Sequence, residues 1–399
     1  MATTLNQSIG ERIRARRKLL GISVRLAADR AGIHHSTWSR IETGRMGADN
    51  RYTLAAIAAA LKCSTTEITG GPVAPVDRAT AQAQASVPSM RLALIETDLT
   101  EPSWAPPAPI ALLVREELLI RDLRARCDYV GASRRTGETL RALHAATFGP
   151  DRPEALRLLI QVCDTISFVL RHIGYPAETW LAAERAQQAA EMLDDPVMLG
   201  LAAWTRANAA MSCGSYQRTL AIAERGVDDL MAAASDTGYA EVLGQLHLTC
   251  ANALAGMGRL TEAIERLRAA EALASRVGDT DTFGLMFGPA NIAFWHVCME
   301  TDGGDPGRAV ALARDVNPLA VASPSRQAAF FLDTARALAH SDNDKQAVRM
   351  ILAAERIAPQ KVHSAPLVAE LVRSLLQQTK SRAVDAELRG ICERIGLMP

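Results

Sequence analysis

A short helical pattern recurs beyond residue 180 and sets the repeat length of the fold. Residues 181–185 read Leu-Ala-Ala-Glu-Arg, residues 221–225 read Ala-Ile-Ala-Glu-Arg and residues 352–356 repeat the first copy, with a looser copy at 263–266. Turn-forming residues precede each copy, and the spacing is close to 40 residues. A helix pair of this length cannot bury its apolar face alone, so neighbouring pairs must stack. The pattern predicts an all-α solenoid of antiparallel helix pairs.

Six such pairs follow one another, and weaker helices at 110–147 are expected to cap the first. The segment 253–270 resembles a tetratricopeptide (TPR) helix–turn–helix, because its small residues permit close helix crossing. The repeat is longer than a minimal TPR unit, so we describe the body as TPR-like. An irregular α-helical bundle is the alternative. The predicted pairs are 154–194, 196–235, 239–278, 282–318, 324–358 and 364–396.

Near the start of the chain, residues 23–44 have the pattern of two short helices joined by a glycine turn. Ser23 is a good N-cap, because its hydroxyl can accept a backbone N–H from the next turn. Small residues at Ala27 and Ala28 allow a second helix to cross closely. Gly32 supplies the positive φ that a sharp turn requires.

The second of these helices, expected at 35–42, has two different faces. Trp38 and Ile41 lie on one face and are expected to be buried. The other face carries hydrogen-bonding side chains alone, as a helix that reads base edges in the major groove requires. These side chains are His35, Ser36, Thr37, Ser39 and Arg40.

Residues 8–70 resemble the Cro/C1-type (XRE family) helix-turn-helix domain of bacterial repressors. The resemblance rests on Ala28, Gly32, Trp38, Ile41 and the Ile-Glu-Thr-Gly run that ends at Gly44. It implies a five-helix DNA-binding domain. Ala27 departs from the family, which has a larger aliphatic residue there, and packing by Leu26 is expected to compensate.

The resemblance also implies which residues touch DNA. His35, Ser36 and Arg40 would contact bases, and Thr43 and Arg45 in the following loop would contact phosphate. The alternative is a helix-turn-helix segment that serves only as a protein interface. The candidate DNA contacts are Ser23, His35, Ser36, Thr37, Ser39, Arg40, Thr43 and Arg45.

The other helices of this domain follow from apolar spacing. The first, at 9–20, is expected to bury Ile9, Ile13 and Leu20 and to expose its arginines at positions 12, 14, 16 and 17. A fourth is expected at 53–61 and a short fifth at 65–68, which Gly70 ends.

Charge and composition divide the chain further. Residues 1–70 have a net charge of +6 and the remainder −6, which is typical of a nucleic-acid reader attached to a body that does not bind DNA. Residues 71–109 are rich in Pro, Ala, Gln and Ser, so they are expected to form a semi-extended linker, with 90–99 open between strand and helix. The expected domains are therefore 1–70, 71–109 and 110–399.

Several classes of protein are disfavoured. The seven cysteines are scattered, without CxxC pairs, so neither a disulfide framework nor a metal site is expected and the protein is expected in the cytoplasm. No hydrophobic signal segment is expected, and the least charged run, 282–299, is expected to be a buried helix and not a membrane span. Catalytic and cofactor motifs are absent, so no enzyme and no cofactor are predicted. Five of the 44 basic residues are lysine, which favours a GC-rich bacterial genome.

The repeats carry a candidate effector site. Asn208, Asn252 and Asn291 lie on the first helices of three successive pairs, in steps of 44 and 39 residues, so they are expected at equivalent positions. Asparagine offers an acceptor and two donors for a peptide backbone. The alternative is that each asparagine bonds a neighbouring helix or loop. Asp333 would continue the row, and Trp295 and His296 could line an apolar pocket or belong to the core.

The sequence therefore predicts a bacterial transcription regulator that binds double-stranded DNA. One such domain covers half a site, so a homodimer on an inverted repeat is expected. A small-molecule or peptide effector would bind the repeats. The plan is similar to that of peptide-pheromone receptors with helix-turn-helix and TPR parts. The alternative is a scaffold that docks a protein partner without a small-molecule effector.

Overall fold

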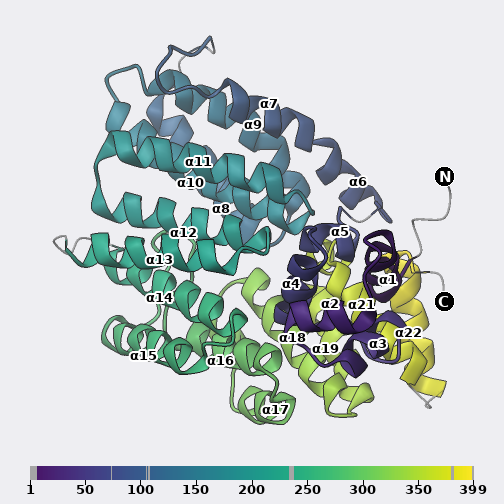
Figure 1. Ribbon diagram of the computed structural model, residues 1–399. Helices are drawn as coiled ribbons and strands as arrows, with labels where there is room; N and C mark the ends of the chain where they lie inside the picture. Colours follow the sequence, from purple (N-terminus) through teal and green to yellow (C-terminus); the bar gives the residue numbers. More distant parts are fainter. Residues whose placement is uncertain are drawn as a thin grey trace. The chain divides into compact units, whose positions relative to one another are not determined.

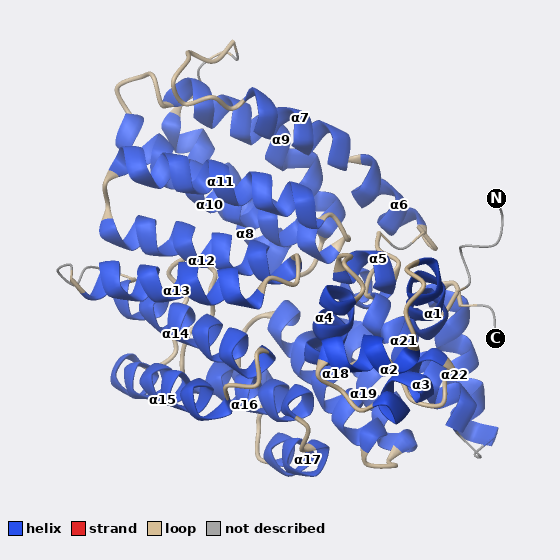
Figure 2. Ribbon diagram, in the orientation of Figure 1, coloured by secondary structure: helices blue, strands red, loops and turns tan. Residues whose placement is uncertain are grey.

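The computed structural model describes residues 7–72, 74–104, 106, 108–232, 238–378 and 382–397. All regular elements among these residues are helices (Figure 2), apart from one isolated bridge between Thr280 and Phe287. The helices are α1 (Ile9–Leu19), α2 (Val24–Ala31), α3 (His35–Glu42), α4 (Arg51–Ala60), α5 (Thr65–Thr69), α6 (Arg78–Ala85), α7 (Val87–Glu96), α8 (Ile110–Ala125), α9 (Tyr129–Ala146), α10 (Arg152–His172), α11 (Pro176–Leu193), α12 (Pro196–Ser212), α13 (Tyr216–Met231), α14 (Tyr239–Gly256), α15 (Leu260–Val277), α16 (Pro289–Gly303), α17 (Pro306–Arg314), η1 (Pro318–Ala320), α18 (Pro324–His340), α19 (Asp344–Ile357), α20 (Pro359–His363), α21 (Pro366–Gln378) and α22 (Arg382–Ile395).

Helices are present in the range of every predicted pair. Five of the pairs are α10–α11, α12–α13, α14–α15, α16–α17 and α18–α19, and the last corresponds to α21–α22. The two helices expected at 110–147 are α8 and α9. Figure 1 shows α10 to α15 as successive layers, each pair lying against the next.

Contacts between neighbouring repeats keep the spacing found in the sequence. The side chain of Asp164 accepts from Thr205, 41 residues later, at 2.9 Å. Gln245 donates to the Leu285 carbonyl oxygen, 40 residues later, at 2.7 Å, and Asn252 donates to the Met211 sulfur, 41 residues earlier, at 3.2 Å. The 40-residue period is therefore the distance along the chain between side chains that touch.

Small residues bring the helices close together. On α11 the buried positions are Thr179 and five alanines, among them Ala182, Ala186 and Ala190. On α14, a Cβ added at Gly244 would lie 2.1 Å from Cζ of Phe287. Only glycine fits there, because the ring occupies the space of a side chain. The alanine-rich composition thus serves close helix packing.

The chain folds into two compact units, each built from separate stretches of sequence. The first contains residues 1–77, 294–318 and 327–399, and the second contains 78–293 and 319–326. The boundary falls inside α16 and again inside α18, so each of these helices contributes residues to both units.

The five helices expected in the first 70 residues are confirmed within a few residues of their predicted ends. Serine caps begin three of them: Ser8 and Ser64 form capping boxes, and Ser23 accepts from the Leu26 N–H at 3.2 Å. The fourth helix starts at Arg51, two residues before the prediction, because Asn50 accepts from the Thr53 N–H and acts as its N-cap.

The core of these helices contains most of the predicted apolar residues. Ile9, Ile13, Trp38 and Ile41 are buried. Leu20 was expected inside but is 37% exposed, because α1 ends at Leu19 and Leu20 occupies the cap. Leu26 is 43% exposed, so it does not fill the space beside Ala27 as expected.

One arginine of α1 lies inside, where the sequence predicted an exposed face. The Arg17 side chain is 12% exposed and forms two bonds with the buried carboxylate of Glu42, at 2.5 and 2.8 Å. Glu42 also accepts from the Trp38 indole N–H at 2.6 Å. A single buried carboxylate thus joins the first helix to the third.

The segment 71–109 was expected to be semi-extended, but it contains two helices, α6 and α7. Val87, Met90, Ala93 and Leu94 are the buried residues of α7, and their three- and four-residue spacing is that of a helix with one apolar face. The sequence left a strand or a helix open for residues 90–99, and the structure shows a helix as far as Glu96. Among the described residues, no helix is long and apolar enough to cross a membrane.

We expect Glu42→Ala to destabilise the first three helices by about 3–5 kcal/mol, because the change leaves the Arg17 cation buried without its partner. Hydrogen exchange of peptides from residues 9–42 in the full chain measures this loss. Asp29→Ala, an exposed acid on α2, is the control and should change stability by less than about 0.5 kcal/mol. Equal exchange in the two variants would contradict the role given to Glu42.

Candidate nucleic-acid interface

The third helix is held by one face and offers the other to solvent. Trp38 and Ile41 are 0% and 2% exposed, and Ala27 and Ala28 on α2 are fully buried. Gly32 ends α2 with φ of 65°, which turns the chain sharply into α3. These contacts fix the direction in which the outer face of α3 points.

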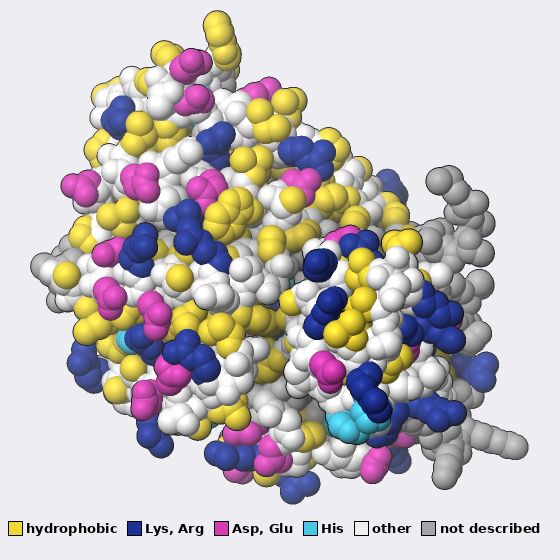
Figure 3. All heavy atoms as spheres, viewed as in Figure 1, with side chains coloured by type: hydrophobic (Ala, Val, Ile, Leu, Met, Phe, Trp, Pro, Cys, Tyr) yellow, Lys and Arg dark blue, Asp and Glu magenta, His cyan; other side chains and the backbone are white. Residues whose placement is uncertain are grey.

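The outer face of α3 carries the predicted polar residues. His35, Ser36, Ser39 and Arg40 are exposed, and Thr37 is half-buried. The Arg40 guanidinium has no hydrogen bond or ion pair among the described residues, so its fork of donors is available. In Figure 3, histidine side chains lie beside Lys and Arg side chains near α2 and α3.

Some predicted contacts already have partners within the chain. The Ser36 hydroxyl lies 2.7 Å from Nδ1 of His34, and the Thr43 hydroxyl donates to the Ser39 carbonyl oxygen at 2.8 Å. Ser23 accepts the capping bond of α2. Arg45 is exposed, and its guanidinium is free of bonds to the described residues. All eight candidate contacts remain predictions, with Arg40 and Arg45 the most available cations among them.

His34 was not among the predicted contacts. This residue is the N-cap of α3, and its ring nitrogen accepts from the Ser36 N–H at 3.3 Å. Its ring lies 4.1 Å, centroid to centroid, from that of His35. The signal was its position directly before the predicted helix, where a side-chain acceptor is required.

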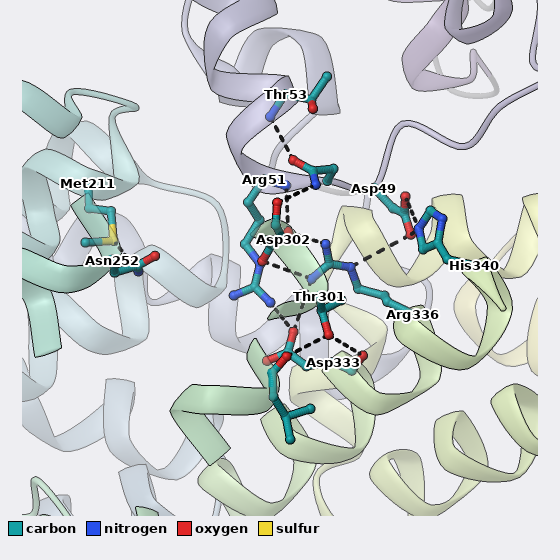
Figure 4. Close-up of polar contacts among 12 residues, drawn as sticks. Asp49, Arg51, Thr53, Met211, Asn252, Thr301, Asp302, Asp333, Arg336 and His340 are labelled. Atoms are coloured by element: carbon teal, nitrogen blue, oxygen red, sulfur yellow. Dashed lines mark hydrogen bonds and ion pairs between the residues drawn. The ribbon is translucent and has the colours of Figure 1, made fainter. Parts of the chain in front are cut away.

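The segment between α3 and α4 and the first residue of α4 are anchored by a set of charges within the first unit, of which Asp49, Asp302 and Arg336 are almost fully buried. Figure 4 shows this anchor network, in which Asp302 lies between Arg51 and Arg336. Arg51 Nε lies 3.0 Å from Asp302, and the Arg51 backbone N–H donates to Asp302 at 3.1 Å. Asp302 is 1% exposed at its side chain and also pairs with Arg336. The members of the anchor network are Asp49, Arg51, Asp302, Asp333, Arg336 and His340.

The remaining members complete the network around Arg336 and Asp49. Asp333 pairs with Arg51 and, at 3.2 Å, with Arg336. His340 Nε2 lies 3.0 Å from both carboxylate oxygens of Asp49. Three carboxylates thus face two guanidinium groups and one imidazole, so the charges balance when His340 is protonated.

The pKa values of two members are shifted in the direction that supports this pairing. Burial alone raises the pKa of Asp49, but the hydrogen bond from His340 and the charge of Arg336 bring it below its ordinary value. The hydrogen bond to Asp49 raises the pKa of His340 above its ordinary value, against the opposing effect of burial. Each partner therefore favours the charged form of the other.

Asp333 is a member of this network and was predicted to contact an effector. It is 7% exposed and its carboxylate already pairs with two arginines. Trp295 and His296 lie half-buried on α16. For these three residues an effector contact stays a prediction.

The asparagine row lies in the second unit, and each member bonds another repeat or its own helix. Asn208 donates to the Trp204 carbonyl oxygen at 3.0 Å and accepts from Arg171 at the same distance. Asn252 donates to the Met211 sulfur. Asn291 is 2% exposed and accepts from Arg326 at 2.8 Å. Within the part of the chain that the structure describes, no cluster of His, Cys, Asp and Glu side chains is arranged to hold a metal ion.

We expect the contribution of the Asp49–His340 pair to fall as the pH rises. The raised pKa of His340 means that its contribution is fully present below its unfolded pKa of about 6.5 and is lost as the pH rises through its folded pKa. The lowered pKa of Asp49 means that its contribution is present above about 3.9 and is lost as the pH falls through its folded pKa. The pair is thus strongest between about pH 4 and 6.5.

Hydrogen exchange of peptides from residues 48–61, corrected for intrinsic rates, measures this dependence. The difference in protection between the natural chain and His340→Gln should shrink from pH 5.5 to pH 8.5. A difference that stays constant over this range would contradict the ion pair.

Comparison with known proteins adds one assignment. Residues 8–69 match the family model described as a helix-turn-helix domain. No curated protein matches the chain.

Similar solved structures include three that are 12–13% identical. PlcR of Bacillus thuringiensis, in complex with the peptide PapR7 and DNA, is 12% identical with a TM-score of 0.39, over 90% of this chain and 99% of PlcR. The apo competence regulator ComR of Streptococcus vestibularis is 13% identical with a TM-score of 0.24, over 99% and 100%. The TPR domain of P58(IPK) is 13% identical with a TM-score of 0.26, over 94% and 99%.

Because the identities and TM-scores are this low, no functional argument is drawn from the three structures. The assignment of residues 8–69 is based on the family model and on the local geometry. The matched residues span all five helices from α1 to α5 and include the buried face of α3. Residues 8–69 of this chain therefore form a helix-turn-helix domain.

Proposed function

We propose that the chain is a sequence-specific DNA-binding transcription regulator that acts by binding and carries out no catalytic step. The observation that carries this proposal is α3, which is fixed by buried Trp38 and Ile41 and exposes a polar face with Arg40. Residues 1–70 would bind DNA, residues 71–109 would connect, and residues 110–399 would bind an effector and mediate dimerisation. The resemblance of residues 8–70 to the XRE family supports a bacterial cytoplasmic protein of that family.

Recognition would combine general attraction with base contacts. The net charge of +6 on residues 1–70 attracts phosphate, and binding should weaken steeply with salt. Arg40 could fork onto O6 and N7 of a guanine, which is the commonest specific contact in the major groove. Arg45, in the loop after α3, would bind phosphate and fix the register.

One helix-turn-helix domain covers half of a site. A homodimer on an inverted repeat would therefore double the contact, with the helical repeats as its assembly surface. An effector that favours one arrangement of the dimer would change its affinity for DNA.

The first test is selection of bound fragments from the genome that encodes the protein. We expect a single enriched inverted repeat, whose half-site spacing would define the dimer. Salt-sensitive binding without enrichment, repeated in the presence of cell extract as a source of effector, would contradict sequence-specific regulation. It would favour the alternative that the domain is a protein interface.

The second test is Arg40→Ala on the enriched site. The binding free energy should weaken by about 1–3 kcal/mol, because a bidentate contact to guanine is removed. This weakening should occur only on sites that keep the preferred base at one position. Quantitative binding to the site and to random DNA measures the difference. Arg225→Ala, an exposed arginine on α13, is the control and should leave both affinities unchanged. An equal loss on both DNAs would make Arg40 a phosphate contact.

A further inference from the structure

A pocket of about 530 Å³ lies within the first unit, between its N-terminal and its C-terminal helices. One wall comes from α1, α5 and the segment that follows α5, and the other comes from the start of α21 and the end of α22 (Figure 1). Pockets that hold small molecules have volumes of about 300–1,000 Å³. This pocket is therefore large enough for a small-molecule ligand.

The two walls are held together by contacts within the same unit. Leu367 of α21 packs against the hydrophobic core of the N-terminal helices. The Glu370 carboxylate is 6% exposed, and it accepts from the Ala48 backbone N–H at 3.5 Å and from Arg373 at 2.9 Å. A ligand in the pocket would thus touch two groups of helices that already pack against each other.

Most of the side chains that line the pocket are apolar, and they come from both walls. Pro72 and Ala74 are exposed, so the pocket opens to solvent. Such a lining favours a ligand with an apolar body, because binding removes apolar surface from water. Apolar lining residues include Ile9, Ala74, Val76, Pro366, Ile395 and Leu397.

Two arginines bring positive charge to the pocket. Arg12 of α1 and Arg373 of α21 both line it, and both are half-buried. Arg373 pairs with Glu370. Arg12 donates to the Thr69 carbonyl oxygen at 3.2 Å, and no carboxylate of a described residue lies within ion-pair distance of its guanidinium. Among the described residues, the charge of Arg12 therefore has no anionic partner.

Glu67 also lines the pocket, but its carboxylate is engaged with its own helix. Its Oε2 accepts from the Ser64 backbone N–H at 2.7 Å and from the Ser64 hydroxyl at 3.0 Å. These bonds belong to the capping box that begins α5. Glu67 therefore does not replace the missing partner of Arg12.

The Arg12 guanidinium lies against backbone and close to a second cation. A Cβ added at Gly70 would lie 2.5 Å from Cζ of Arg12. Burial and the charge of Arg373 lower the pKa of Arg12, against the opposing charges of Glu370 and Glu11. The charged form of Arg12 is thus less favourable here than in water, and an anion beside it would stabilise that form. A guanidinium fork matches the two oxygens of a carboxylate.

We propose that this pocket binds a small amphiphilic monocarboxylate, with the carboxylate on Arg12 and the apolar body between the two walls. One unpaired cation matches a monoanion better than a phosphate monoester, whose charge is about −1.5 to −2 at pH 7. The binding site stands without DNA, whereas its role as an effector site rests on the proposed function. In that role the ligand would strengthen the contact between the DNA-binding helices and the C-terminal helices of the first unit.

Calorimetric titration of the full chain with decanoate and with phenylbutanoate tests the proposal. Saturable binding of at least one of these carboxylates is expected. Acetate has the head group without the body, and decanol has the body without the charge, so each should bind at least tenfold more weakly. Equal binding of decanol would overturn the role of Arg12, and absence of saturable binding by both carboxylates would overturn the site.

Variants test whether the ligand occupies this pocket. Arg12→Gln should weaken binding at least tenfold, because it removes the unpaired cation. Ala369→Phe should weaken binding as much, because it fills the pocket from α21 without a change of charge. Arg14→Gln, an exposed arginine on the same helix as Arg12, is the matched control and should bind as the natural chain does. Binding as tight as that of the natural chain in either pocket variant would overturn the proposal.

Thermal unfolding separates a ligand contact from a structural role. The carboxylate should raise the unfolding temperature of the natural chain and of Arg14→Gln, because it binds the folded state. It should leave the unfolding temperature of Arg12→Gln unchanged, and Arg12→Lys, which keeps the charge, should recover part of the shift. Equal shifts in Arg12→Gln and the natural chain would contradict the assignment, even if Ala369→Phe fails to fold.

These measurements need no DNA, so the two proposals can fail separately. Saturable binding of a carboxylate without any selected DNA site would keep the pocket and remove its role as an effector site. A selected DNA site without carboxylate binding would keep the regulator and remove the pocket as a ligand site.

Discussion

The first unit depends on a set of paired charges, of which Asp49, Asp302 and Arg336 are almost fully buried. Asp302 and Arg336 are 1% and 5% exposed at their side chains, and they face Asp49, in the segment between α3 and α4, and Arg51, the first residue of α4. Removing one partner of such a group leaves an uncompensated charge, which costs about 3–5 kcal/mol. The helix-turn-helix domain is therefore joined to the C-terminal helices of the first unit by a network that is stable only when all its charges are paired. Such a network favours two discrete states, one with the contacts formed and one with them broken.

Much of the architecture could be predicted from the sequence because its determinants are local. The helix pairs follow from apolar spacing and turn residues, and the 40-residue period reappears in the structure as the spacing of touching side chains such as Asp164 and Thr205. The boundaries of α3 were predicted to the residue, since a turn glycine precedes it and its buried face has helical spacing. Periodicity over ten or more residues carries this information without tertiary contacts.

The remaining features depend on contacts between residues far apart in the chain. Nothing near Arg51 indicates that Asp302, 251 residues later, is its partner. Arg17 was predicted to be exposed because its own helix gives no sign of Glu42. The three asparagines were expected at equivalent positions, but Asn291 lies near the start of α16, whereas Asn208 and Asn252 lie near the ends of α12 and α14. The arginine partners of Asn208 and Asn291 could not be predicted, since Arg171 and Arg326 lie outside the repeated pattern. The helix α7 was not predicted because the Pro-rich composition of residues 71–109 indicated a linker, although the buried residues of α7 form one apolar face.

The anchor network also imposes an order on biosynthesis. A ribosome that adds roughly 5–20 residues per second needs roughly 15–60 s to proceed from Arg51 to Arg336. During this interval the five N-terminal helices can fold while the side chains of Asp49 and Arg51 remain hydrated, because their partners Asp302, Asp333 and Arg336 have not yet been synthesised. A nascent chain, or one truncated before α18, would therefore display its DNA-binding helices without the contacts that restrain them in the finished protein.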